Sequence, residues 1–115
     1  MSLASESLGQ RQRRFARMVG QLLDWAYANG YEVTLGDAYR DPRVFGISGQ
    51  TMGYGHPYSN HKLRLAIDLN LFRDGRYLSQ GEAHAPLHDY WDSIGGGPRI
   101  PGDMNHYSLE WEGRR

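Results

Sequence analysis

The segment at residues 66–72 constrains the fold of this chain more than any other. Its sequence, Ala-Ile-Asp-Leu-Asn-Leu-Phe, alternates apolar and polar side chains, which is typical of a β-strand with one buried face. Because strand residues alternate between faces, Asp68 and Asn70 share one face and the aliphatic residues share the other. An aspartate in such a strand is costly to bury unless it is paired or bound to a metal ion. Asp68 is therefore a candidate site residue.

Two histidines and a second aspartate lie on either side of Asp68 in the sequence and could share a site with it. His61 precedes it by seven residues, and Asp103 and His106 form an Asp-x-x-His pair further along the chain. Two imidazoles and one carboxylate can hold a tetrahedral zinc ion and leave the fourth position open, as in catalytic zinc sites. We therefore predict Zn²⁺ as the cofactor, with His61, Asp68 and His106 as its ligands. Asp103 remains available as a general base.

Other polar residues are candidates for contacts around this centre. Arg40 follows a predicted strand and would stabilise a developing oxyanion. Ser59 would orient substrate or a metal ligand. His56 lies in a glycine-rich stretch at 41–58, which we interpret as a wall or lid; it either faces substrate or is an exposed loop residue. Tyr107 belongs either to the cleft or to the core.

A rival histidine pair has helical spacing. His84 and His88 are four residues apart, but the sequence His-Ala-Pro-Leu-His lacks the glutamate that a zincin helix places after its first histidine. Pro86 also disturbs a helix there. We expect surface or capping roles for both.

The remaining elements follow from periodicity and turn residues. They are an amphipathic helix at 10–29, a strand at 31–35, a hairpin turn at Asp74-Gly75 with a return strand at 77–78, a short helix at 86–94 and a last strand at 105–111. With 115 residues, we expect one domain over 1–115, with a frayed lead-in at 1–9.

Composition narrows the classes of partner and the location. The formal net charge is zero, so broad electrostatic capture of nucleic acid is not expected. The chain has no cysteine, so any metal must be held by His, Asp or Glu. No signal peptide or membrane span is visible, so we expect synthesis in the cytoplasm and no membrane insertion. We also expect the protein to be a monomer.

These residues resemble a known family pattern. Ser59, His61, Ala66 and Asp68 fit Ser-x-His-x-x-Gly-x-Ala-x-Asp, although Arg64 stands at the Gly position. The Asp103–His106 pair fits the later Glu/Asp-x-x-His, and Arg40 fits an arginine after the first strand. The chain thus resembles the zinc D-alanyl-D-alanine peptidase superfamily, which includes VanX- and VanY-like enzymes. The pattern is most similar to the phage L-alanyl-D-glutamate endopeptidases.

The resemblance implies both a fold and an activity. The fold would be α+β, with a small antiparallel sheet and packed helices, as in the hedgehog signalling domain. The activity would be hydrolysis of an amide bond in peptidoglycan stem peptides. The protein would reach the cell wall after release or export by another route. A D-Ala-D-Ala carboxypeptidase or dipeptidase is the alternative within the class. A non-catalytic, zinc-containing wall-binding or phage tail module is the alternative outside it.

Overall fold

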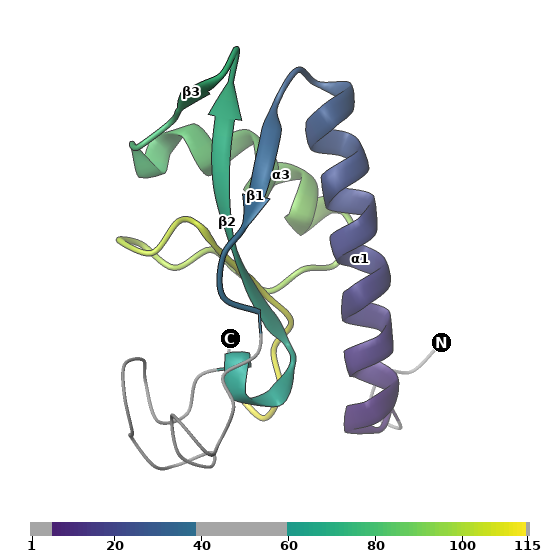
Figure 1. The fold of residues 1–115 in the computed structure, drawn as a ribbon. Helices are drawn as coiled ribbons and strands as arrows, with labels where there is room; N and C mark the ends of the chain where they lie inside the picture. Colours follow the sequence, from purple (N-terminus) through teal and green to yellow (C-terminus); the bar gives the residue numbers. More distant parts are fainter. Residues whose placement is uncertain (1–5, 39–59, 115) are drawn as a thin grey trace.

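The computed structural model describes residues 6–38 and 60–114, which form a small antiparallel sheet with two α-helices (Figure 1). The elements are α1 (Leu8–Ala28), β1 (Glu32–Leu35), the 3₁₀ turn η2 (Asn60–Leu63), β2 (Ala66–Arg73), β3 (Arg76–Tyr77), the 3₁₀ turn η3 (Gly81–His84), α3 (Ala85–Ser93) and β4 (His106–Ser108). This mixture of helices and antiparallel strands agrees with the expected α+β class.

Strand β2 is the centre of the sheet. It pairs with β1 along one edge, and with both β3 and β4 along the other. All three pairings are antiparallel, and the β2–β4 register places Asp68 opposite His106. The candidate ligands of two distant segments are therefore brought together by strand pairing.

The pattern within β2 is the one predicted from its sequence. Ile67, Leu69 and Leu71 are buried, whereas Asp68 and Asn70 are only partly buried. The strand then turns through Asp74-Gly75, where both residues have positive φ angles of 53° and 74°. Such a pair is typical of the tight hairpin turns that favour Asn-Gly or Asp-Gly, because glycine accepts this conformation without steric cost.

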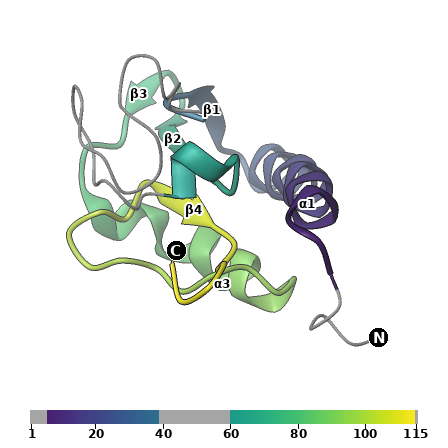
Figure 2. The ribbon, with the colours of Figure 1, turned by 90° about the horizontal axis from the view of Figure 1, so that it is seen from below.

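The apolar core lies between the sheet and the helices. Figure 2 shows α3 next to β4 and α1 along the flank of the sheet. Helix α1 buries Phe15, Met18, Leu22 and Ala26, as its 3.6-residue period predicts. The rings of Phe15 and Trp91 meet edge to face with centroids 5.9 Å apart, which joins α1 to α3.

Hydrogen bonds at the start of α1 and beyond the end of β4 account for differences from the predicted bounds. Helix α1 begins two residues earlier than expected because Ser7 and Gln10 form a capping box, each side chain bonding to the other's backbone N–H. Strand β4 is shorter than predicted. Beyond it, the N–H of Leu109 donates to Leu65 O, and Trp111 bridges to Arg114 instead. In the described part of the chain, no helix is long and apolar enough to cross a membrane.

Candidate metal centre

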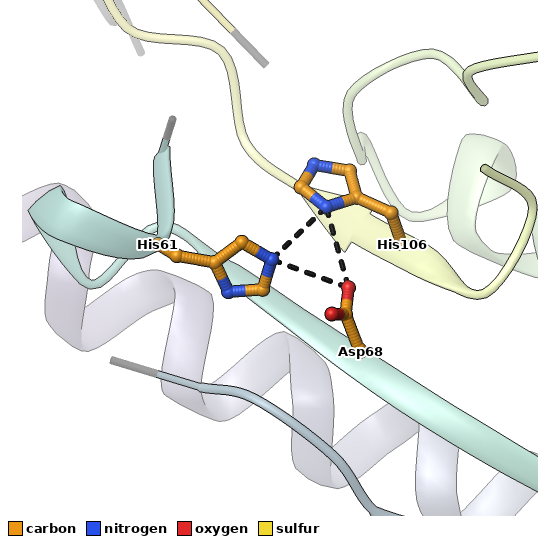
Figure 3. A group of neighbouring side chains, drawn as sticks. All are labelled: His61, Asp68 and His106. Atoms are coloured by element: carbon orange, nitrogen blue, oxygen red, sulfur yellow. Dashed lines mark hydrogen bonds and ion pairs between the residues drawn. The ribbon is translucent and has the colours of Figure 1, made fainter. Parts of the chain in front are cut away.

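Three potential ligands from three elements converge at one end of β2 (Figure 3). His61 comes from η2, Asp68 from β2 and His106 from β4. His61 Nε2 lies 3.2 Å from Asp68 Oδ1 and 3.2 Å from His106 Nδ1, and His106 Nδ1 lies 3.5 Å from Asp68 Oδ1. Each residue thus directs one atom toward a common point.

The triangle of ligand atoms has the size that a small metal ion requires. Tetrahedral zinc with bonds of about 2.0–2.1 Å keeps its ligand atoms roughly 3.3 Å apart. The three observed separations, 3.2, 3.2 and 3.5 Å, bracket that value. Electron-rich atoms this close repel one another unless a cation or a proton lies between them. The residues therefore form a cluster that could hold a metal ion.

The orientation of His61 is set by the backbone. Its Nδ1 lies 3.2 Å from Ala38 O, and a carbonyl oxygen only accepts. Nδ1 therefore carries the proton and Nε2 presents its lone pair to the cluster, as metal-binding histidines require. The neighbouring Asn60 fixes the turn itself, because its side-chain amide donates to Leu109 O at 2.7 Å and Arg114 O at 2.9 Å.

Asp68 is the partly buried anion of the cluster. Burial raises its pKa, but the adjoining imidazole rings of His106 and His61 outweigh that effect and hold the pKa of Asp68 well below its ordinary value. The chain leaving β1 packs closely against it: a Cβ at Gly36 would lie 3.2 Å from Asp68 Cβ. The N–H of Gly36 also donates to Asp68 O at 2.8 Å. Gly36 therefore fixes the backbone of Asp68, and the two imidazoles lower the pKa of its carboxyl group.

A tight turn places Asp103 beside the cluster. The N–H of His106 donates to Asp103 O at 3.1 Å, and Asp103 Oδ2 lies 4.0 Å from His106 Nδ1. The Asp103 side chain is 53% exposed, whereas those of His61 and His106 are almost fully buried. Asp103 is thus next to the cluster and open to solvent, which is the position a base that works on water requires.

The chain matches no family model, no curated protein and no solved structure.

One backbone angle nevertheless bears on the family pattern. Arg64 has a φ of 56°, in the left-handed region that glycine adopts most readily. Arg64 is the residue that stands where the pattern has glycine. The backbone at this position is therefore one that glycine would adopt at less cost than arginine.

Of the other predicted site residues, the described structure includes only Tyr107. Arg40, Ser59 and His56 lie outside the described residues, as does the stretch at 41–58. Tyr107 is fully buried, in the apolar core. It follows His106 in β4, so its side chain lies on the opposite face of that strand.

The expectation that His84 and His88 are surface or capping residues was wrong. Both are buried. His84 Nδ1 lies 2.6 Å from the Tyr107 hydroxyl, and the His88 ring stacks on Tyr107 with centroids 4.2 Å apart. His88 Nε2 donates to Met104 O at 2.7 Å. These partners lie about twenty residues away in sequence, so no local pattern indicated them.

Burial also fixes the protonation of this second group. It lowers the pKa of His84 to about 4, with a smaller contribution from nearby His88, and it lowers the pKa of His88 as well. It raises the pKa of Tyr107. Both imidazoles are therefore neutral near pH 7, and the phenol keeps its proton.

Proposed function

We propose that this protein is a zinc metallopeptidase that hydrolyses an amide bond in peptidoglycan stem peptides, most closely as an L-alanyl-D-glutamate endopeptidase does. One observation carries the proposal. A triangle of two imidazole nitrogens and a carboxylate oxygen, with edges of 3.2–3.5 Å, lies beside the exposed carboxylate of Asp103. Metal ligands with an adjacent free base are the minimum apparatus of a hydrolytic metal site.

The fold and the family pattern support the same proposal. Small antiparallel sheets with packed helices occur in the D-Ala-D-Ala peptidases and the hedgehog domain, which is the fold that we propose here. The left-handed backbone at Arg64, with φ of 56°, supports the alignment of His61 and Asp68 with the family pattern. Each ligand assignment depends on that alignment as well as on the geometry.

The residues have distinct roles in the proposed reaction. His61, Asp68 and His106 would hold the metal, and zinc, when bound, would act as a Lewis acid toward water and the scissile carbonyl. Asp103 would accept a proton as the oxygen of water attacks the carbonyl carbon. It would then give that proton to the departing amine nitrogen as the C–N bond breaks. Arg40, outside the described residues, would stabilise the negative charge on the carbonyl oxygen.

The test is digestion of purified peptidoglycan, with released amines measured and products identified by mass spectrometry. We expect wild-type protein to release amines, a chelator to stop release and added zinc to restore it. The products separate the alternatives, because a carboxypeptidase would free D-alanine whereas an endopeptidase would free whole stem peptides. No amine release with any divalent metal would contradict the enzyme proposal and favour a binding or structural module.

Two variants separate metal binding from chemistry. His106→Ala should lose bound zinc, measured by elemental analysis, together with all activity. Asp103→Asn should keep one zinc per chain but lose at least about 100-fold in kcat, the usual contribution of a general base. Full activity in Asp103→Asn would show that another residue is the base.

A further inference from the structure

A pocket of about 500 Å³ is lined in part by the loop that precedes His106. It lies on the edge of β2 where the pairing changes from one strand to another. There the N–H of Leu69 donates to Asn105 O at 2.9 Å, and the N–H of Leu78 donates to Leu71 O at 2.8 Å. Asn105 and Leu78 line the pocket from its two sides. In Figure 1, β3 and the loop that leads into β4 lie on the same side of β2.

The pocket is close to the proposed base. Gly102 and Met104, the two neighbours of Asp103, belong to its wall, and so does Asn105, the residue before His106. The Asp103 side chain is itself half exposed. The loop at 102–105 therefore contributes both to the pocket wall and to the position of the proposed base.

His84 supplies a buried hydrogen-bonding group on the pocket wall. His84 is 4% exposed, and its Nδ1 lies 2.6 Å from the Tyr107 hydroxyl. Within the described residues, that nitrogen is the one hydrogen-bond partner of this fully buried hydroxyl. The Tyr107 O–H must therefore donate to Nδ1, because the phenol hydrogen would otherwise have no acceptor. Neutral His84 then carries its own proton on Nε2, the ring nitrogen that does not contact Tyr107.

The charges around the pocket select among possible ligands. Burial lowers the pKa of His84 to about 4, so near pH 7 its Nε2–H is a neutral donor and not a cation. Glu82 also lines the pocket and brings a carboxylate. A neutral donor beside a negative charge favours an uncharged carbonyl oxygen over a second carboxylate.

We infer that this pocket is a substrate subsite in which His84 Nε2–H donates to a neutral carboxamide or peptide carbonyl oxygen of the stem peptide. The inference rests on the proposed function, because it assumes that the ligand is the same stem peptide. Tyr107 acts through His84 and is a positioning residue, since its hydroxyl selects which ring nitrogen of His84 holds the proton.

The experiment uses full-length, zinc-loaded protein and synthetic stem peptides whose D-glutamyl α-carboxyl group is either amidated or free. We expect the amidated peptide to have the lower KM with wild-type protein. His84→Ala should raise the KM of the amidated peptide about tenfold, change kcat less than twofold and remove the preference for the amide. His84→Gln, which restores an N–H donor, should recover most of the affinity. Zinc content and melting temperature should match wild type in His84→Gln.

Nitrogen-15 NMR of the histidine rings tests the positioning role directly. Wild-type His84 should show the Nε2-protonated form, and Tyr107→Phe should show a mixture of both forms with an intermediate KM. A loss of kcat without a change in KM, or equal KM values for the Ala and Gln variants, would overturn the subsite. If wild-type protein cleaves neither peptide, the proposed hydrolysis is wrong. In that case the His84 Nε2 signal must still shift on addition of amidated peptide, or the subsite is wrong too.

Discussion

Asp68 shows how a single residue connects the fold to the site. Its position among apolar residues in β2 identifies Asp68 as a candidate site residue from sequence alone, because an unpaired carboxylate there would be strongly destabilising. The structure supplies the compensation: two imidazoles at 3.2 and 3.5 Å and a pKa held below its ordinary value. The alternation of β2 therefore predicted both the strand and the residue on which the candidate site depends.

Arg64 has a backbone conformation that is unusual for arginine. Its φ of 56° falls where a side chain costs roughly 1–2 kcal/mol and glycine costs little. Since Arg64 also has interactions of its own, Arg64→Ala is the matched control for Arg64→Gly: both remove the side chain, and only one relieves the backbone.

We predict that Arg64→Gly has a higher free energy of unfolding than Arg64→Ala, by about 1 kcal/mol. The reason is that alanine keeps the Cβ that the left-handed conformation disfavours. Urea denaturation of the two chelator-treated variants measures the difference. Equal midpoints would mean that this residue is not held at positive φ in solution.

Other residues of the region were beyond sequence reasoning. Asn60, His84 and His88 have neighbours that give no local signal, and each is buried only because a distant segment supplies its hydrogen-bond partner. Polar side chains are usually exposed, so a surface location is the natural expectation for them. Only the positions of Leu109, Tyr107 and Met104 in space reverse that expectation.

At the scale of elements, α3 supports the loop that carries the proposed base. His88, in the middle of α3, donates to Met104 O at 2.7 Å, and Met104 follows Asp103 directly. The contact fixes the backbone between Asp103 and His106 against the helix. Mutation of the residues that orient metal ligands commonly lowers metal affinity by about 10–100-fold.

We predict that His88→Ala weakens zinc binding about tenfold and lowers the free energy of unfolding by about 2–4 kcal/mol. Leu87→Ala is the control, because Leu87 is a fully buried neighbour in the same helix and its loss should cost similar stability. Competition with a zinc-binding dye gives both affinities. If the two variants bind zinc equally well, the contact from α3 contributes to stability alone.

At the scale of the whole molecule, the candidate ligands join three separate segments. His61 belongs to η2, Asp68 to the central strand and His106 to the last strand, so the ligand set exists only when the sheet is formed. A metal ion that binds the folded chain and not the unfolded chain must therefore stabilise the fold.

We predict that free zinc at 100 times its dissociation constant stabilises the protein by about 2.7 kcal/mol, which corresponds to a rise in melting temperature of about 10 °C. Thermal unfolding with chelator and with buffered zinc measures the shift. His106→Ala should show no shift, since it lacks one of the three ligands. A similar rise in that variant would place the binding elsewhere on the chain.

The architecture was predictable to the extent that it follows local patterns. The period of α1, the alternation of β2 and the Asp74-Gly75 turn each specify their own element. The arrangement of β3 and β4 along one edge of β2 has no such local cause, because it depends on which distant strands pair. The pocket between them, and the role we give His84, could therefore come only from the structure.

The donor atoms of the cluster also bear on competition among ions. Calcium takes six to eight oxygen ligands at about 2.3–2.6 Å, and magnesium also prefers oxygen, in an octahedral arrangement. Two of the three converging atoms here are imidazole nitrogens. We therefore expect calcium and magnesium to compete only weakly for this centre with ions that favour nitrogen ligands.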